Sequence, residues 1–162
     1  IANEIEELHQ NKVKINFIGN LELMPEFAKD ALLSAAEYTK DNTGITLTLA
    51  LSYSSRWEIL RATQLIAQDV KNGKLQESEI TEELYSSYLT TAGIPDPELI
   101  IRTSGEFRIS NFLLWQIAYS EFYFTDKLWP DFKEKDFEEA IQSYQNRERR
   151  FGKTSKQINQ LS

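Results

Sequence analysis

Two early segments of the chain alternate apolar with polar or small side chains. In residues 45–53 every second position is Ile, Leu or Tyr, and residues 13–17 show the same alternation over a shorter length. A period of two residues is typical of a strand that turns one face toward a core. The apolar run 99–101 and the aromatic run 121–125 indicate two more strands. The pattern therefore predicts four strands.

Between these strands, apolar residues recur every three or four positions, as on one face of an amphipathic helix. This spacing and the cap residues predict helices that begin at Pro25, at the capping box of Ser55 and Glu58, and at Thr81, and that span residues 112–119 and about 134–150. Strands and helices thus alternate, which implies an α/β fold with a largely parallel sheet and helices packed on it. At 162 residues, one domain spanning the whole chain is expected.

Composition and charge narrow the class of protein. The net charge of −7 argues against a nucleic-acid surface, which needs a basic face. The absence of cysteine excludes a disulfide framework and a thiolate metal site. No apolar run approaches the roughly 20 residues of a membrane span, and no signal-peptide pattern is visible. We therefore expect a cytoplasmic globular protein.

The most informative stretch places two arginines around a predicted turn between a strand and a helix. The strand ends in Arg102, and Arg108 follows six residues later. Ser110 and Asn111 stand at the N-cap position of the helix predicted at 112–119. Guanidinium groups bind phosphate oxygens in bidentate fashion, and a helix N-terminus adds free N–H donors and a partial positive charge. The stretch predicts a pocket for a dianionic group such as a diphosphate.

The residue chemistry alone leaves a second interpretation of these arginines open. Both could pair with the carboxylates of Asp96, Glu98 or Glu106 in a surface network. Arg56 lies at another predicted strand-to-helix junction, where a first-turn surface position is favoured over a ligand contact. His9, the only histidine, lies in a charged segment, which favours a surface position over a catalytic one.

A long run of uncommon residues then links the predicted turn to the following strand. The run is Asp96-Pro97, Ile101-Arg102-Thr103, Gly105-Glu106, Arg108-Ile109-Ser110-Asn111-Phe112-Leu113-Leu114-Trp115-Gln116, Tyr119, Glu121-Phe122-Tyr123-Phe124 and Leu128-Trp129-Pro130-Asp131-Phe132. It resembles the signature of the cis-prenyltransferases, the undecaprenyl diphosphate synthase family. Residues 52–59 resemble an upstream motif of that family, with serines where glycines are common, and residues 147–152 resemble its C-terminal segment. The likeness covers nearly the whole chain and implies the α/β fold of that family.

The resemblance implies a reaction and the residues that serve it. These enzymes condense isopentenyl diphosphate onto an allylic diphosphate, form a cis double bond in each cycle and make a polyprenyl diphosphate. They use Mg²⁺, act as homodimers, and would contact a membrane at most peripherally, through the lipid product. Carried over, the substrate-binding residues are Arg102, Arg108, Ile109, Ser110, Arg150 and Gly152, the last two within an Arg-x-Gly element thought to reach across the dimer. Glu121 resembles the Mg²⁺-associated glutamate.

Two departures from the family pattern stand out. Phe107 occupies a position where some members carry a histidine, so a proton-handling role there is absent. The Asp-Gly-Asn-Gly-Arg-type motif, which binds the allylic diphosphate and supplies the catalytic aspartate, has no match, since the chain contains no Asp-Gly pair. We interpret the chain as the carboxyl-terminal portion of such an enzyme, truncated at its N-terminal side and inactive alone. The alternative is a non-catalytic partner subunit or a diphosphate-binding module of the same fold.

Overall fold

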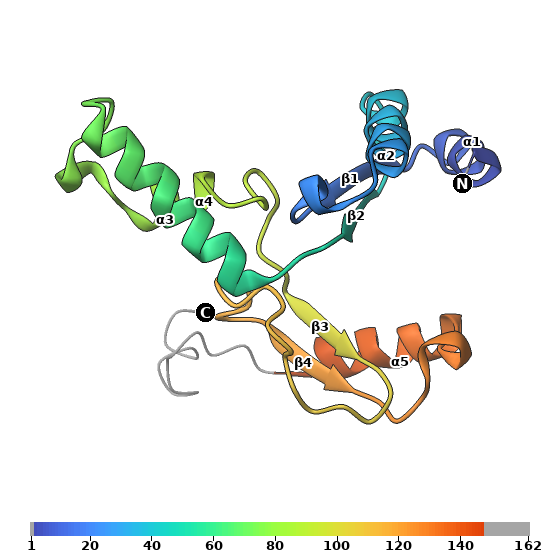
Figure 1. Cartoon of the computed structure of the whole chain (residues 1–162). Coiled ribbons are helices and arrows are strands. Elements are labelled where there is room, and N and C mark those ends of the chain that lie inside the picture. Colours follow the sequence, from blue (N-terminus) through green and yellow to red (C-terminus); the bar gives the residue numbers. More distant parts are fainter. Residues whose placement is uncertain (1, 148–162) are drawn as a thin grey trace. The chain divides into compact units, whose positions relative to one another are not determined.

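The computed structural model of the chain describes residues 2–147, with side chains from residue 4 onward (Figure 1). The chain divides into two compact units, Ile1–Ile94 and Pro95–Ser162. Within the described residues, each unit contains one pair of parallel strands. The predicted combination of parallel strands and helices is therefore confirmed, and the four strands pair as two sheets. That the two units form one domain stays a prediction.

The first unit alternates helices and strands in the predicted order. Its elements are α1 (Ala2–Gln10), β1 (Lys14–Ile18), α2 (Glu26–Thr39), β2 (Thr46–Ala50), α3 (Ser55–Lys71) and α4 (Glu82–Ser87). β1 and β2 pair in register from Lys14 opposite Thr46 to Ile18 opposite Ala50. The two segments with period-two alternation thus become neighbouring strands, as their pattern predicted.

A buried hydroxyl joins α2 to β1. The Thr39 side chain is fully buried; its hydroxyl accepts from the Ile15 N–H at 3.0 Å and donates to the Ala35 carbonyl at 2.9 Å. Ile15 and Ala35 are themselves buried. Because a buried polar group is costly without a partner, this pair of bonds fixes the end of α2 against the strand.

The start of α3 differs from the prediction by one residue. Ser54 is the N-cap and Ser55 the first helical residue, so Ser55 and Glu58 do not stand in the N-cap and N3 positions of a capping box. The Glu58 carboxylate is instead buried and accepts from the Tyr53 hydroxyl at 2.6 Å and from the Thr90 N–H at 2.8 Å. The carboxylate thus has a partner far away in the sequence, which the local pattern could not indicate.

The second unit, as far as residue 147, contains β3 (Leu99–Arg102), β4 (Glu121–Phe124) and α5 (Glu134–Gln145). β3 and β4 are parallel, with Leu99 opposite Glu121 and Arg102 opposite Phe124. α5 packs on β4 and buries Ala140 completely. The helix predicted at 134–150 thus ends at Gln145, and residues 148–150 lie outside the described part.

The helix predicted at 112–119 is absent, and this prediction was wrong. Turns occupy the segment between the two strands, and its φ angles are +54° at Ser110, +61° at Asn111 and +49° at Leu113. A right-handed helix needs negative φ throughout. The three left-handed residues therefore exclude a helix start here, although the apolar spacing suggested one.

None of the described helices is long and apolar enough to cross a lipid bilayer.

Candidate functional site

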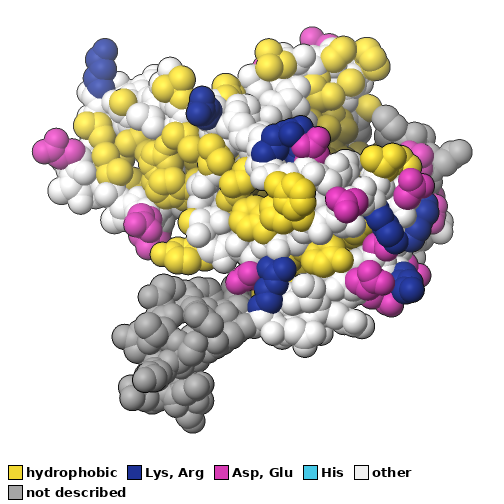
Figure 2. Space-filling model, turned by 90° about the horizontal axis from the view of Figure 1, so that it is seen from below, with side chains coloured by type: hydrophobic (Ala, Val, Ile, Leu, Met, Phe, Trp, Pro, Cys, Tyr) yellow, Lys and Arg dark blue, Asp and Glu magenta, His cyan; other side chains and the backbone are white. Residues whose placement is uncertain are grey.

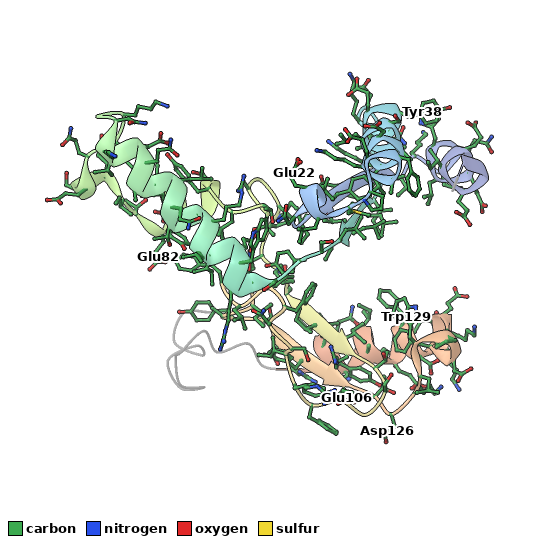
Figure 3. The ribbon with its side chains drawn as sticks, viewed as in Figure 1. Glu22, Tyr38, Glu82, Glu106, Asp126 and Trp129 are labelled. Carbon is green, nitrogen blue, oxygen red and sulfur yellow. The ribbon has the colours of Figure 1, made fainter. Side chains whose placement is uncertain are left out.

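The site begins where β3 and β4 end. Because the strands are parallel, their carboxyl ends lie at the same edge, and the loops beyond them are joined through the backbone. The Gly105 N–H donates to the Thr125 carbonyl at 2.9 Å and the Ser104 N–H to the Lys127 carbonyl at 2.7 Å. Figure 3 labels Glu106 and Asp126 on these loops, beyond the tips of the two strands. In α/β proteins this strand edge is the usual place for a ligand.

Gly105 is needed for this junction. Its φ is +64°, a left-handed value that glycine adopts without strain. A Cβ at this position would lie 3.0 Å from Oδ1 of Asp126. A larger residue here would therefore crowd the Asp126 side chain and would have to adopt a left-handed backbone that strains any residue with a Cβ.

A cavity of about 260 Å³ opens beside the strand ends. Both predicted arginines line it, together with the predicted Ile109. The rest of its wall is apolar and consists of Ile100, Ile101, Phe112, Ile117, Phe122 and Phe124. The cavity thus brings two arginine residues together with a mostly apolar wall, an arrangement that suits a ligand with an anionic head and an apolar body.

The two arginines have different partners. Arg108 forms an ion pair with Glu106, and its side chain is 65% exposed. Arg102 is half-buried and has no carboxylate partner among residues 4–147. The surface-network interpretation therefore applies to Arg108 only, whereas Arg102 lines the cavity and has no neutralising carboxylate among the residues that the structure describes.

Ser110 does not join these residues. It is exposed and absent from the cavity wall. Since no helix starts at Asn111, the predicted helix N-terminus contributes neither its free N–H groups nor its dipole. The anion-binding groups that this unit brings together are the two guanidiniums, not guanidiniums with a capped helix end.

Glu121 lies at the other end of the strand pair from Arg102. Its carboxylate accepts from Nη1 of Arg147 at 2.9 Å. In the strand register Glu121 faces Leu99, and Arg102 faces Phe124 three residues further on, a separation of about 10 Å along the strand. No group of three His, Asp or Glu side chains within residues 4–147 could hold a metal ion. Among the described residues, Glu121 is therefore paired with a cation and does not belong to a cluster of three metal-binding side chains.

An ion pair supports the loop after β4. Asp136, buried at the start of α5, accepts from the Lys133 N–H at 2.9 Å and from the Lys127 ammonium. The hydrogen bond to Lys127 lowers the pKa of the Asp136 carboxyl and raises that of the Lys127 ammonium. Because the Lys127 carbonyl also accepts from Ser104, α5 is linked through Lys127 to the turn that carries the site.

Comparison with known proteins identifies the family. The family model described as "Putative undecaprenyl diphosphate synthase" matches residues 1–152. The chain belongs to the undecaprenyl diphosphate synthase family. The resemblance carried by residues 96–132 is thereby confirmed.

Bacterial members of this family are close in sequence. The isoprenyl transferase of Clostridium perfringens is 55% identical over 152 residues, which are 94% of this chain and 60% of that protein. The isoprenyl transferase of Geobacillus kaustophilus is 53% identical over 149 residues, or 92% of this chain and 58% of that protein. This chain thus spans about 60% of the length of the curated relatives it matches.

Solved structures of the family share the fold. Lavandulyl diphosphate synthase from Lavandula x intermedia, in complex with dimethylallyl diphosphate, has a TM-score of 0.90 and 38% identity, covering 94% of this chain and 66% of that one. A probable undecaprenyl diphosphate synthase from Campylobacter jejuni has a TM-score of 0.80 and 34% identity, covering 94% and 69%. The expected family fold is confirmed.

The remaining candidates lie elsewhere in the chain. Arg150 and Gly152 are outside the described residues, so their predicted roles stay predictions. In the first unit, Arg56 is exposed in the first turn of α3. The His9 ring is half-buried and lies 4.5 Å from the Tyr38 ring, centroid to centroid, so it packs between α1 and α2.

Sequence reasoning missed the aromatic wall of the cavity. Phe122 and Phe124 were predicted as strand residues without a role in binding. Residues two positions apart on a strand share a face, and the register sets these two beside Ile100 and Arg102. The period-two signal that predicted the strand could therefore also have predicted an apolar wall next to the first arginine.

Proposed function

We propose that this chain belongs to a cis-prenyltransferase that condenses isopentenyl diphosphate onto an allylic diphosphate to give a polyprenyl diphosphate. The observation that carries the proposal is the cavity in which Arg102 and Arg108 meet an apolar wall. The names of the relatives, isoprenyl transferases and lavandulyl diphosphate synthase, support it. Since the chain spans about 60% of those relatives and lacks the Asp-Gly motif, we propose that it binds isopentenyl diphosphate but supports little turnover alone.

The chemistry of the cavity fits a small prenyl diphosphate. Two guanidinium forks can each donate a pair of hydrogen bonds to phosphate oxygens, and the aliphatic and aromatic wall removes the hydrocarbon part from water. At about 260 Å³ the cavity lies just below the roughly 300–1,000 Å³ of drug-sized ligand pockets. Its size favours a five-carbon diphosphate over a long polyprenyl chain.

The proposed role of the arginines is to position the substrate. Isopentenyl diphosphate keeps its own diphosphate during condensation, whereas the allylic partner loses one. Holding the retained diphosphate at a fixed place brings the reacting double bond to one orientation, which lowers the entropic part of the barrier. The two arginines therefore bind isopentenyl diphosphate and orient its double bond for the reaction.

Further parts of the proposal concern Mg²⁺ and assembly. Mg²⁺ is commonly bound through one or two carboxylates together with substrate phosphates, and Glu121 could supply one such carboxylate if Arg147 released it. A homodimer in which Arg150 and Gly152 approach the substrate, and a cytoplasmic location, complete the proposal. The metal part is tested by titrating isopentenyl diphosphate with and without Mg²⁺ into wild-type and Glu121→Gln protein, where the substitution should abolish any Mg²⁺-dependent gain in affinity.

Calorimetric titration of isopentenyl diphosphate tests the site itself. We expect Arg102→Ala and Arg108→Ala each to weaken binding about 10- to 100-fold, because hydrogen bonds between charged groups contribute about 1.5–3 kcal/mol. Arg61→Ala is the matched control, since Arg61 is an exposed arginine of the other unit that lies over Trp57. Unchanged affinity in both cavity variants would refute the site. Near-normal chain elongation by the 162-residue chain would refute the expected lack of turnover.

A further inference from the structure

An exposed phenyl ring extends the apolar wall of the cavity. Phe107 lies between Glu106 and Arg108 in the sequence, and 74% of its surface is exposed. Its ring centroid is 5.1 Å from that of Phe124, and the Phe124 ring stacks on Phe122 at 5.8 Å with an angle of 9° between planes. Phe122 and Phe124 both line the cavity. The three rings therefore form a continuous row that runs from the cavity wall toward solvent.

The row is unusual because its outer ring is exposed beside charged groups. Figure 2 shows exposed hydrophobic side chains, in yellow, among charged ones, and Phe107 is among the most exposed large hydrophobic residues of this unit. An exposed phenyl ring gains free energy when a ligand covers it. A ligand in the cavity whose apolar body extends along this row of rings, past Phe124, would reach Phe107. The position of the ring thus favours a ligand with an anionic head and an apolar body over a purely ionic one.

We propose that Phe107 is a specificity-determining residue that covers the hydrocarbon part of a bound prenyl diphosphate. This inference rests on the proposed function, because it takes the two arginines as the site of the diphosphate head. It adds that Phe107, outside the cavity wall itself, gives the site its preference for short hydrocarbon esters of diphosphate over inorganic diphosphate.

The test compares two ligands on the same protein. Isopentenyl diphosphate and inorganic diphosphate are titrated by calorimetry into wild-type chain and into Phe107→Ala, Phe107→Leu and Phe107→His variants. We expect Phe107→Ala to lower the affinity ratio of the ester to the inorganic ion about 3- to 10-fold, roughly the effect of one or two methylene groups. Phe107→Leu should keep most of the ratio, and Phe107→His should lose part of it. Affinity for inorganic diphosphate should change less than twofold.

A matched control, together with the affinity ratio of the two ligands, distinguishes a failure of this inference from a failure of the proposed function. Phe137→Ala removes another half-exposed phenyl, on α5 and outside the cavity wall, and should leave the ratio unchanged. A constant ratio in Phe107→Ala would overturn the inference while leaving the arginine site intact. An equal loss for both ligands would also overturn it, since Phe107 would then only shape the loop that carries Arg108. If neither ligand binds the folded wild-type chain, the proposed function fails first.

Discussion

Two strand-to-loop junctions in this chain use polar residues in opposite ways. After β2, the Glu58 carboxylate is buried and bonded to Tyr53 and Thr90, so its charge serves the fold. After β3, no helix follows, and Arg102 and Arg108 line a cavity. A buried and satisfied ionic group stabilises its surroundings but cannot bind a ligand, whereas an accessible guanidinium can. The difference makes the strand edge after β3 the candidate binding edge.

The largest expected effect comes from removing the Glu58 carboxylate at the junction after β2. Glu58→Ala should lower the free energy of unfolding by about 2–4 kcal/mol, because the Thr90 N–H and the Tyr53 hydroxyl, both in partly buried contacts, would lose their acceptor. Urea unfolding followed by circular dichroism measures this. Glu138→Ala, at an exposed position, should change the value by less than about 0.5 kcal/mol. A Glu58→Ala protein as stable as the control would show that this junction is not held by its carboxylate.

The stability that the Asp136–Lys127 ion pair gives to the junction after β3 should depend on pH. The folded-state pKa of Asp136 is lowered below its ordinary value of 3.8, chiefly by Lys127. A lowered pKa means that the stabilisation is present above the ordinary value and is lost as the pH falls through the folded-state value. Asp136→Asn should therefore be less stable than wild type at pH 7, with the difference shrinking in acid. Urea midpoints at pH 7 and pH 3 test this, and an equal difference at both would contradict it.

The smallest expected effect concerns the ion pair between Glu106 and Arg108 in the loop after β3. Glu106→Gln removes the carboxylate that neutralises Arg108, so the affinity for inorganic diphosphate should rise about 2- to 5-fold, as expected for an exposed pair worth less than about 1 kcal/mol. Calorimetry at low salt measures it, with Glu138→Gln as the control for net charge. Weaker binding in Glu106→Gln would mean that Glu106 itself helps to hold the ligand.

The sequence predicted the strands well because their signal is local. Period-two alternation in residues 45–53 and the apolar run at 99–101 each fix a strand without reference to the rest of the chain. The helix at 112–119 was wrong because apolar spacing does not report φ, and Ser110, Asn111 and Leu113 are left-handed. The box of Ser55 and Glu58 was wrong because α3 begins one residue earlier than predicted, with Ser54 as its N-cap.

The placement of the two arginines at the candidate site was also predictable from a local signal in the sequence. Arg102 and Arg108 were expected together because a strand end and the turn after it lie close in sequence, and both line the cavity. Their separate partners were not predictable, since the ion pair of Arg108 with Glu106 depends on the loop conformation. The distance of Glu121 from Arg102 follows from the parallel register, which no single-strand pattern reveals.

The two arginines of the cavity are carried by different kinds of backbone. Arg102 ends a hydrogen-bonded strand, and its carbonyl accepts from Thr125 at 3.0 Å, whereas Arg108 lies in a segment without helix or strand. An incoming anion would therefore meet one cation whose backbone is held by a strand and one that first has to exchange its ion pair with Glu106 for the ligand. Substitutions along the loop can then change how quickly a ligand is released, while the strand preserves where it is held.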